Sequence, residues 1–533
     1  MGYRDDNLCF GKVRSIDGSK VIIKIEELLL EIQDEKYQVE VGALVNCGGL
    51  HGDTICMIDR IRIQELEKKG ELIEIKIAEM TILGSKKEDG KLTRGVDYLP
   101  PLNCSAYFIP GDKLNNLLGV ELPKDKQDFS KYIKVGTRSM KNAGDVYLDI
   151  DKLLGRHVAI LGTTGSGKSS TVASIVQSIL EQYPYPRLIF FDVHNEYATA
   201  FSDKWESKTH LLPWKDYSLP YWYLDLEEFK EIYNCSGIGV NQEAKLKEWI
   251  TELKQENVKQ DSTVTVDSPV YFSIDDLLEK ITQEMKDLAT SNRKPFESMK
   301  MKIDSINNDR RYYFLRKDIK TRKELAEYFI DLFGLTEQGK YLSILDLSGI
   351  PSEVRTTCVG VLSRLCFDFS YWDADPENLP LALVLEEAHN YIPEESSSDF
   401  NLCKKRIEKI AKEGRKYGIS LMVVTQRPSN VSTTVLSQCG TYITLRLTND
   451  IDQNKIKRLL PDTLGEQANM LPSLRDGEAL ISGDGINLPG KVRFTPPNPE
   501  PKSNDVRYHK SWSTGVPEDY NVKSIIKDWQ HTK

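Results

Sequence analysis

The spacing of apolar residues divides the chain into stretches of different period. From Phe10 to about Ile63, short apolar runs are broken by Asp-Gly, Gly-Gly and Gly-Asp pairs, and further short runs continue to about Asp151. Short strands at close spacing, separated by turn residues, are typical of a small barrel. The pattern therefore predicts an N-terminal β-barrel region over residues 1–151.

From residue 152 onward, apolar runs alternate with helical patterns. The helical pattern TVASIVQSILEQ lies between the apolar runs HVAILG and RLIFFDV, and similar runs return later in YLSILDLSG, LALVLEEAHNYI, ISLMVVTQRPS and GTYITLRLTND. Apolar strands that alternate with helices indicate a parallel sheet with crossover helices. We expect an α/β core in two parts, over residues 152–225 and 336–495.

Two stretches lack this alternation of apolar strands and helices. Residues 226–335 are charged and helical in period, as in IDDLLEKITQEMKDLA, and contain no strongly apolar strand of the parallel type. They predict a helical insertion inside the core. A Pro-rich run, FTPPNPEPKSN, leads into the last residues. We expect residues 496–533 to form an extended arm and a short helix.

Composition narrows the class of protein. The 533 residues are enough for two to four domains. The net charge of −9 excludes a polycation that coats nucleic acid, so any such contact must come from local basic patches or from a pore formed on assembly. No apolar run has membrane-spanning length, and the nine cysteines lack metal-ligand spacing. These features predict a cytosolic protein that does not contact a membrane.

The strongest chemical signal follows the first apolar strand of the core. The sequence from Gly162 to Ser169 fits the phosphate-loop pattern G-x-x-x-x-G-K-[ST]. Its glycines let backbone N–H groups surround the phosphates, its lysine reaches the β and γ oxygens, and its serine hydroxyl ligates Mg²⁺. The predicted nucleotide contacts are Gly162, Thr163, Thr164, Gly165, Ser166, Gly167, Lys168, Ser169 and Ser170.

Hydrolysis also needs a carboxylate near Mg²⁺ and a group that orients the attacking water. Glu386 and Glu387 directly follow the apolar run Leu381–Leu385. We interpret Glu386 as the acid on the metal side and Glu387 as the base that activates water. The alternative is the acidic start of a surface helix, against which the preceding apolar strand argues. His389 could sense the nucleotide or lie on a helix surface.

Other polar residues lie at or near strand ends. Asp192 ends the run RLIFFD, at the sheet edge where ligands bind in doubly wound folds, but it is equally compatible with a turn. Gln426 follows the apolar run of ISLMVVT and could sense the γ-phosphate. The basic run that ends near Arg415 allows three interpretations: a solvated helix face, the lining of a nucleic-acid path, or an arginine finger in Arg415.

Five motifs in this order resemble the HerA family of hexameric DNA-translocating ATPases, in the FtsK–HerA branch of P-loop motors. They are GRHVAILGTTGSGKSS, FFDVHNEYATAF, LVLEEAHNYIP, KEGRKYGISLMVVTQRPS and TTVLSQCGTYITLRLTNDID. The resemblance implies a RecA-like core, ATP as the nucleotide, and a homohexamer with ATP sites shared between neighbours. It also implies a central pore that takes double-stranded DNA.

The resemblance assigns further roles. It makes Asp192 the acid of the second strand, Gln426 the polar sensor and Arg415 the trans-acting arginine, and it assigns Arg156 to a neighbour's site. Family members work with nucleases of the NurA type, and bacterial relatives occur beside sirtuin-like NAD-hydrolysing or nuclease effectors in antiphage defence. The leading hypothesis is therefore an ATP-driven motor on double-stranded DNA that serves a separate effector protein. The alternative is a ring scaffold that controls its effector through ATP turnover without translocating.

Overall fold

The computed structural model describes residues 6–32, 35–49, 52–68, 71–86, 91–96, 98–120, 130–139, 144–213, 218–258, 261–316, 325–336, 339–350, 352–395, 401–460, 467–502, 508–517 and 520–532. The chain divides into two compact units. The first contains Met1–Pro184 and Ser420–Glu500, and the second contains Tyr185–Ile419 and Pro501–Lys533. None of the described helices is long and apolar enough to cross a membrane.

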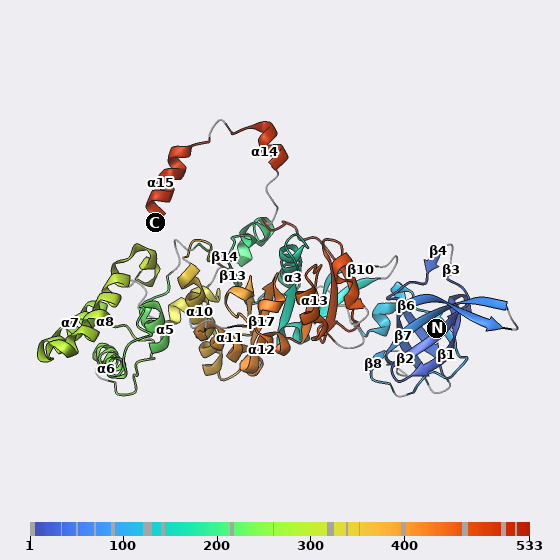
Figure 1. Cartoon of the computed structure of the whole chain (residues 1–533), viewed down its shortest axis with the longest axis horizontal. Coiled ribbons are helices and arrows are strands. Elements are labelled where there is room, and N and C mark those ends of the chain that lie inside the picture. The colour runs from blue at the N-terminus through green and yellow to red at the C-terminus, as the bar shows by residue number, and fades with distance from the viewer. Residues whose placement is uncertain are drawn as a thin grey trace. The chain divides into compact units, whose positions relative to one another are not determined.

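The first unit contains a closed barrel. Its strands run in the order β2-β1-β9-β5-β6-β7-β8, and β2 also pairs with β7, which closes the sheet (Figure 1). Alternate residues such as Val13, Val21 and Ile23 fill the barrel interior. The elements of this region are η1 (Asp6–Leu8), β1 (Cys9–Asp17), β2 (Lys20–Ile25), β3 (Leu29–Ile32), β4 (Glu35–Gln38), β5 (Leu44–Gly48), β6 (Asp53–Lys68), β7 (Glu71–Lys86), β8 (Leu92–Arg94), β9 (Ser105–Phe108) and α1 (Gly111–Leu117).

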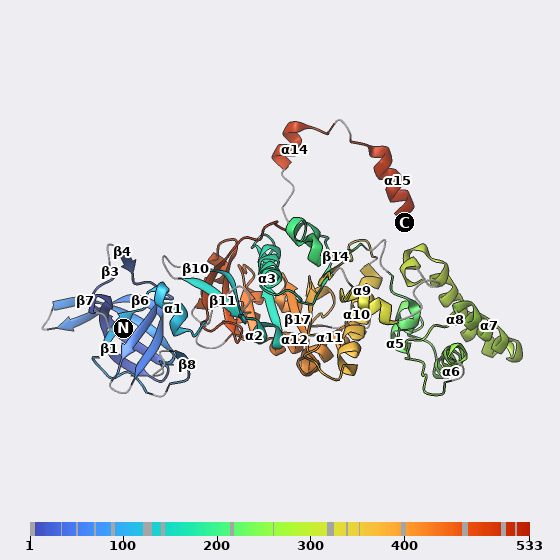
Figure 2. The same cartoon turned by 180° about the vertical axis from the view of Figure 1, so that it is seen from behind.

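The same unit carries the strand that leads into the phosphate loop. Its sheet runs in the order β11-β10-β20-β19-β18-β12-β17, with β18, β12 and β17 parallel and the other strands antiparallel. Helix α3 lies close to β10 (Figure 2). The elements are β10 (Tyr132–Arg138), β11 (Asp145–Asp149), α2 (Ile150–Gly155), β12 (Val158–Leu161), α3 (Lys168–Gln182), β17 (Ile419–Thr425), η8 (Pro428–Asn430), α12 (Thr433–Gln438), β18 (Thr441–Thr444), α13 (Asp450–Lys457), η10 (Gln467–Ser473), β19 (Glu478–Gly483) and β20 (Gly490–Phe494).

The grouping of β10 and β11 differs from the sequence-based expectation. Their β-like pattern assigned them to the barrel region, which was expected to extend to residue 151. In the structure β10 pairs with β20, and β11 pairs with β10, so both belong to the sheet of the phosphate-loop strand. The apolar pattern of a strand does not show which strand it will pair with, and the partner of β10 here, β20, lies near the other end of the chain.

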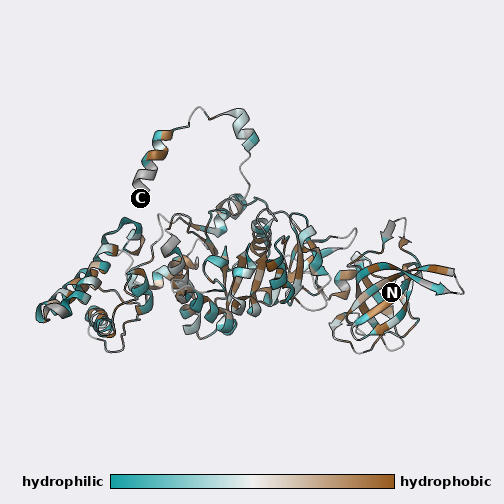
Figure 3. Ribbon diagram, viewed as in Figure 1, coloured by the Kyte–Doolittle hydropathy of each residue, from teal (hydrophilic) through white to brown (hydrophobic). Residues whose placement is uncertain are grey.

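The second unit contains the strands that end in carboxylates. They run in the order β16-β13-β15-β14, and all are parallel. Apolar residues concentrate on the strands, whereas α7 and α8 are largely hydrophilic (Figure 3). The elements are β13 (Leu188–Asp192), α4 (Tyr197–Ala200), η2 (Asp203–Lys208), β14 (Thr209–Leu212), η3 (Tyr221–Tyr223), α5 (Leu226–Ile232), α6 (Val240–Asn257), α7 (Ile274–Asp287), α8 (Thr290–Asn308), η4 (Arg310–Leu315), α9 (Leu325–Leu332), β15 (Leu342–Asp346), α10 (Ser352–Trp372), β16 (Leu381–Leu385), η5 (Ala388–Asn390), α11 (Asn401–Glu413), η7 (Gly414–Tyr417), α14 (Tyr508–Thr514) and α15 (Val522–Thr532).

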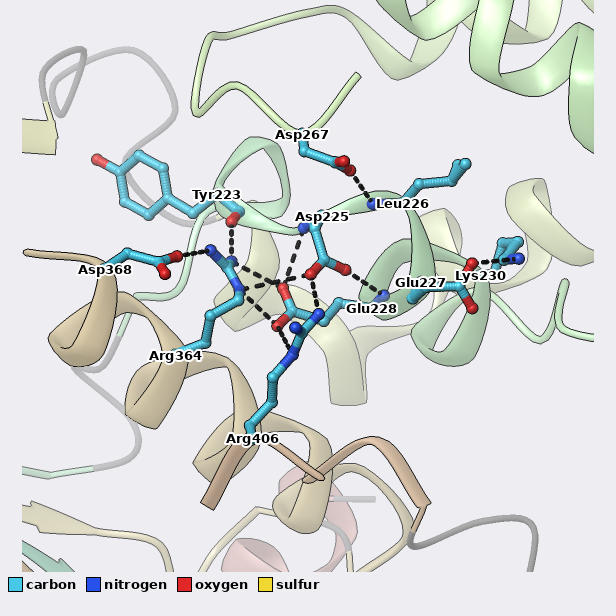
Figure 4. A network of polar contacts seen from close by, with 10 residues as sticks. All are labelled: Tyr223, Asp225, Leu226, Glu227, Glu228, Lys230, Asp267, Arg364, Asp368 and Arg406. Carbon is cyan, nitrogen blue, oxygen red and sulfur yellow. Dashed lines mark hydrogen bonds and ion pairs between the residues drawn. The ribbon is translucent and has the colours of Figure 1, made fainter. Parts of the chain in front are cut away.

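The described residues of 226–335 form helices and no strand, and a buried ionic network fixes the first of these helices. Asp225 and Glu228 form the capping box of α5. Arg364 on α10 donates to both Glu228 oxygens, at 2.7 and 2.8 Å, and Arg406 on α11 pairs with Asp225 (Figure 4). Removing one member of such a network typically costs about 3–5 kcal/mol, because a buried charge is left uncompensated. The expected fold class, α/β with an N-terminal barrel and a helical insertion, is confirmed.

Candidate functional site

The phosphate loop connects β12 to α3 in the first unit. The loop backbone is held at its base by Gly162 N–H, which donates to Thr425 O (3.2 Å), and Thr163 N–H, which donates to Arg446 O (2.9 Å). Lys168 begins α3, so the loop ends where the helix presents unpaired N–H groups and its positive end. This is the arrangement that binds phosphate oxygens.

The loop glycines are required by geometry. Gly165 and Gly167 have φ of +74° and +91°, which side-chain-bearing residues rarely adopt. A Cβ at Gly162 would lie 2.6 Å from Ser166 Oγ and 2.8 Å from Leu445 Cβ, and one at Gly167 would lie 2.8 Å from Gly477 N. Gly162 and Gly167 therefore permit close packing of the loop, and Gly165 permits its turn.

The predicted sensor lies beside the loop in the same unit. Gln426 immediately follows β17, which pairs in parallel with β12. Its side-chain oxygen accepts a hydrogen bond from the Thr164 hydroxyl. The structure thus brings together Gln426 and the exposed turn of the phosphate loop, where a terminal phosphate would be sensed.

The acid pair lies in the second unit. Glu386 and Glu387 follow the fully buried strand β16, and both side chains are buried. Glu387 has φ +48° and ψ +50°, a left-handed conformation that costs a non-glycine residue about 1–3 kcal/mol. Such strain persists at positions where the surrounding structure fixes it, which are often functional sites.

Two neighbours orient these carboxylates. The buried Tyr197 hydroxyl donates to Glu386 Oε2 at 3.0 Å, and His389 Nδ1 lies 3.3 Å from Glu387 Oε2. Burial, and then the negative charge of Glu386, raises the pKa of Tyr197 well above its usual range, so its hydroxyl remains a donor. No sequence pattern indicated a role for Tyr197, and His389 was left with two interpretations.

Asp192 ends β13, next to β16 in the parallel sheet. Its carboxylate accepts backbone N–H groups of His194 (3.2 Å), Glu196 (3.3 Å) and Tyr197 (3.0 Å). Burial raises the pKa of Asp192, and the three N–H donors oppose that rise. The turn-forming role is therefore present in the structure, and it also positions Tyr197 toward Glu386. A contact of Asp192 with nucleotide stays a prediction.

Arg415 lies far from the acid pair of its own chain. It belongs to η7, and Gly418 just beyond it accepts a hydrogen bond from Leu381 N–H at the start of β16. Glu386 follows the other end of that five-residue strand, about 16 Å away. Arg415 is exposed, and no partner of it is found among the described residues.

Arg156 has a similar position in the first unit. It precedes β12, whereas the phosphate loop follows that strand, so it lies at the opposite end of β12 from the loop. Its guanidinium pairs with Asp484. Arg156 therefore lies toward the end of β12 opposite the phosphate loop, and Arg415 toward the end of β16 opposite the acid pair; a nucleotide contact of either one stays a prediction.

The basic run on α11 is mostly engaged within the chain. Lys404 Nζ donates to Glu394 O at 2.9 Å, Arg406 pairs with Asp225, and Lys409 lies 4.5 Å from the centre of the Phe367 ring. These contacts favour the interpretation of α11 as a packed helix with a solvated face over that of a nucleic-acid path.

Comparison with known proteins finds similarity to HerA helicases. The model of the HerA helicase central domain matches residues 133–366. The DNA double-strand break repair helicase HerA of Sulfolobus acidocaldarius is 26% identical over 393 residues, which cover 70% of this chain and 72% of that protein. The probable helicase MJ1565 of Methanocaldococcus jannaschii is 24% identical over 369 residues, covering 68% of this chain and 66% of that protein. The chain is thus similar to HerA-type helicases over about two thirds of its length.

A solved structure shares the fold of the core. VirB4 of Thermoanaerobacter pseudethanolicus superposes with a TM-score of 0.50 and 15% identity, covering 71% of this chain and 98% of that one. The match supports the predicted RecA-like core. The chain spans about two thirds of the length of the first HerA-type relatives that it matches.

The residues present fit ATP with Mg²⁺. A P-loop magnesium ion takes few ligands from the protein, because phosphate oxygens and waters supply the rest. The first unit offers the Ser169 hydroxyl at the start of α3, and the second unit separately offers the Glu386 carboxylate at the end of β16, each a ligand type that Mg²⁺ takes. Among the described residues there is no cluster of three or more His, Cys, Asp or Glu that would form an all-protein metal site.

Proposed function

We propose that this chain is a cytosolic, homohexameric motor that hydrolyses ATP to move on double-stranded DNA. The observation that carries the proposal is the presence of a phosphate loop with Gln426 beside it, and of a buried acid pair, in a chain similar to HerA helicases. Relatives at similar identity are named DNA double-strand break repair helicases.

In this proposal each unit supplies residues for ATP hydrolysis. The phosphate loop binds the β- and γ-phosphates through backbone N–H groups and Lys168. Ser169 and Glu386 would hold Mg²⁺, which would supply charge neutralisation at the phosphates. Glu387 removes a proton from the attacking water, and Gln426 responds to the γ-phosphate. Arg415 and Arg156 contact the nucleotide of a neighbouring subunit, which is supported by their separation from the catalytic groups of their own chain.

The motor serves a separate effector protein, a nuclease or a sirtuin-like NAD hydrolase, in antiphage defence. A docking role for the barrel region is supported by its sequence, which contains no catalytic constellation. The net negative charge of the chain argues against a protein that coats DNA. It favours DNA binding in a channel that forms when subunits assemble.

The test is whether DNA stimulates ATP turnover. Steady-state hydrolysis of the purified chain should rise severalfold with linear double-stranded DNA, and displacement of a bound block from DNA should require ATP. Lys168→Ala is the control, because it removes turnover and displacement together. ATP turnover that DNA leaves unchanged, with no displacement, would favour a ring scaffold that controls its effector through ATP. Native mass measurement of the assembly tests the hexamer and any co-purified effector.

A further inference from the structure

A buried arginine without a counter-ion lies where the barrel region meets the ATPase sheet of the first unit. Arg138, at the end of β10, has 9% of its surface exposed. A guanidinium has five N–H donors. Among the described residues, the acceptor found for them is Leu488 O, 3.3 Å from Nη2, while Nε has no hydrogen-bond partner. Burial lowers the pKa of Arg138 to about 10, and no carboxylate opposes that effect. The group is nevertheless charged at neutral pH.

The guanidinium borders a cavity of about 210 Å³. The barrel region contributes Glu40, Val41, Gly42 and Met57 to its walls, and the sheet and η10 contribute Ser139, Gln467, Met470, Gly490 and Lys491. A Cβ at Gly490 would lie 3.1 Å from Arg138 Nη1, and Gly490 has φ +154°. The missing side chain at this position therefore leaves room beside the guanidinium.

Charge and size restrict what the cavity can hold. Lys491 adds a second cation, although it also lies 3.6 Å from Glu478. Glu40 is exposed and makes no ion pair with Arg138. The volume is smaller than the roughly 300 Å³ at which pockets for drug-sized molecules begin. A buried, uncompensated charge is costly, so a small anion that reaches this cavity gains a strong charge-assisted interaction.

We propose that this cavity binds a small tetrahedral oxyanion such as inorganic phosphate. The anion accepts hydrogen bonds from the unpaired N–H groups of Arg138 and is attracted by Lys491. Because the walls come from both the barrel region and the ATPase sheet, the bound anion holds these two parts together. The site is separate from the phosphate loop and does not depend on the proposed motor activity.

The experiment measures binding of inorganic phosphate to the full-length chain by isothermal titration calorimetry. All proteins carry Lys168→Ala, because the phosphate loop itself binds phosphate. Adding Arg138→Met should weaken phosphate binding at least about tenfold, since a charge-assisted hydrogen-bond set is lost. Arg493→Met on β20 is the matched control, because Arg493 is exposed, and it should bind phosphate like the parent. Glu40→Gln removes a negative charge from the wall and should bind phosphate as tightly as the parent or more tightly.

Folding is checked in the same set of proteins. Without phosphate, Arg138→Met should melt at or above the temperature of the parent, because an apolar side chain replaces a buried charge. With phosphate, the parent should gain thermal stability and Arg138→Met should not. If Arg138→Met fails to fold, Arg138→Lys keeps the charge, loses the planar donor set, and should still bind more weakly.

Hydrogen exchange gives a second measurement. Phosphate should slow amide exchange at residues 41–42, 138–139 and 490–491 of the parent, and this protection should be absent in Arg138→Met. Equal phosphate affinity in the parent and Arg138→Met overturns the proposal. Binding that appears only in Glu40→Gln also overturns it, because Glu40 is then the natural counter-ion.

Discussion

At the scale of single residues, Glu387 combines a buried carboxylate with a backbone conformation that glutamate rarely adopts. Glu387→Gln should leave ATP affinity near normal and slow hydrolysis by about 10²–10⁴-fold, because the base is lost while the phosphate loop is intact. Lys168→Ala should weaken binding and turnover together. Fluorescent-nucleotide binding and steady-state phosphate release measure the two effects, with the exposed Glu395→Gln as control. Normal turnover in Glu387→Gln would contradict the assignment of the base.

The backbone of the same residue leads to a separate prediction. Replacing Glu387 by Gly or by Ala removes the same carboxylate, but only Gly adopts φ +48° without steric cost. The Gly variant should therefore be more stable than the Ala variant by about 1 kcal/mol, while both are inactive. Thermal or denaturant unfolding of the two proteins compares them directly. If the Ala variant is equally stable, the left-handed conformation is not a constraint at this position.

At the scale of elements, the placement of β10 and β11 changes how the barrel should be removed. Deletion of residues 1–129 should retain nucleotide binding and abolish association with the effector, because β10 and β11 remain in the sheet. Deletion of residues 1–151 removes both strands, exposes the edge of β20, and should yield aggregated protein. Nucleotide binding, pull-down and light scattering distinguish these outcomes. If the shorter deletion still binds the effector with unchanged affinity, the barrel is not the docking region.

Elements differ in how far the sequence predicts them. The buried strands β12, β13 and β16 were expected because a continuous apolar run is a local signal, and the candidate site residues were predicted from their positions at the ends of these runs. The hydrogen bond from Tyr197 to Glu386 was not expected, because it joins residues 189 positions apart and a tyrosine at a helix start has no distinctive pattern. Arg138 was missed for the same reason: only its tertiary surroundings show that its charge is uncompensated.

At the scale of the whole molecule, Arg415 connects catalysis to assembly. It lies toward the opposite end of β16 from Glu386, which favours the proposed action on the nucleotide of another subunit. A planar guanidinium placed there stabilises charge that develops on the γ-phosphate, a role that lysine fills poorly. Arg415→Ala and Arg415→Lys should both reduce turnover, by about 10³-fold or more for Ala, and leave ATP affinity of each subunit unchanged.

Mixing two inactive proteins tests the trans role. In rings formed from Arg415→Ala and Glu387→Gln subunits, some interfaces pair an intact Glu387 with the intact Arg415 of a neighbour. Those interfaces should hydrolyse ATP, so the mixture should regain activity that neither protein has alone, once subunit exchange is confirmed by mass measurement. Lys416→Ala, next in sequence and also exposed, is the matched control and should keep its turnover. If exchange occurs and no activity returns, or if Arg415→Ala alone is fully active, Arg415 belongs to a solvated surface and the ATP sites are complete within each subunit.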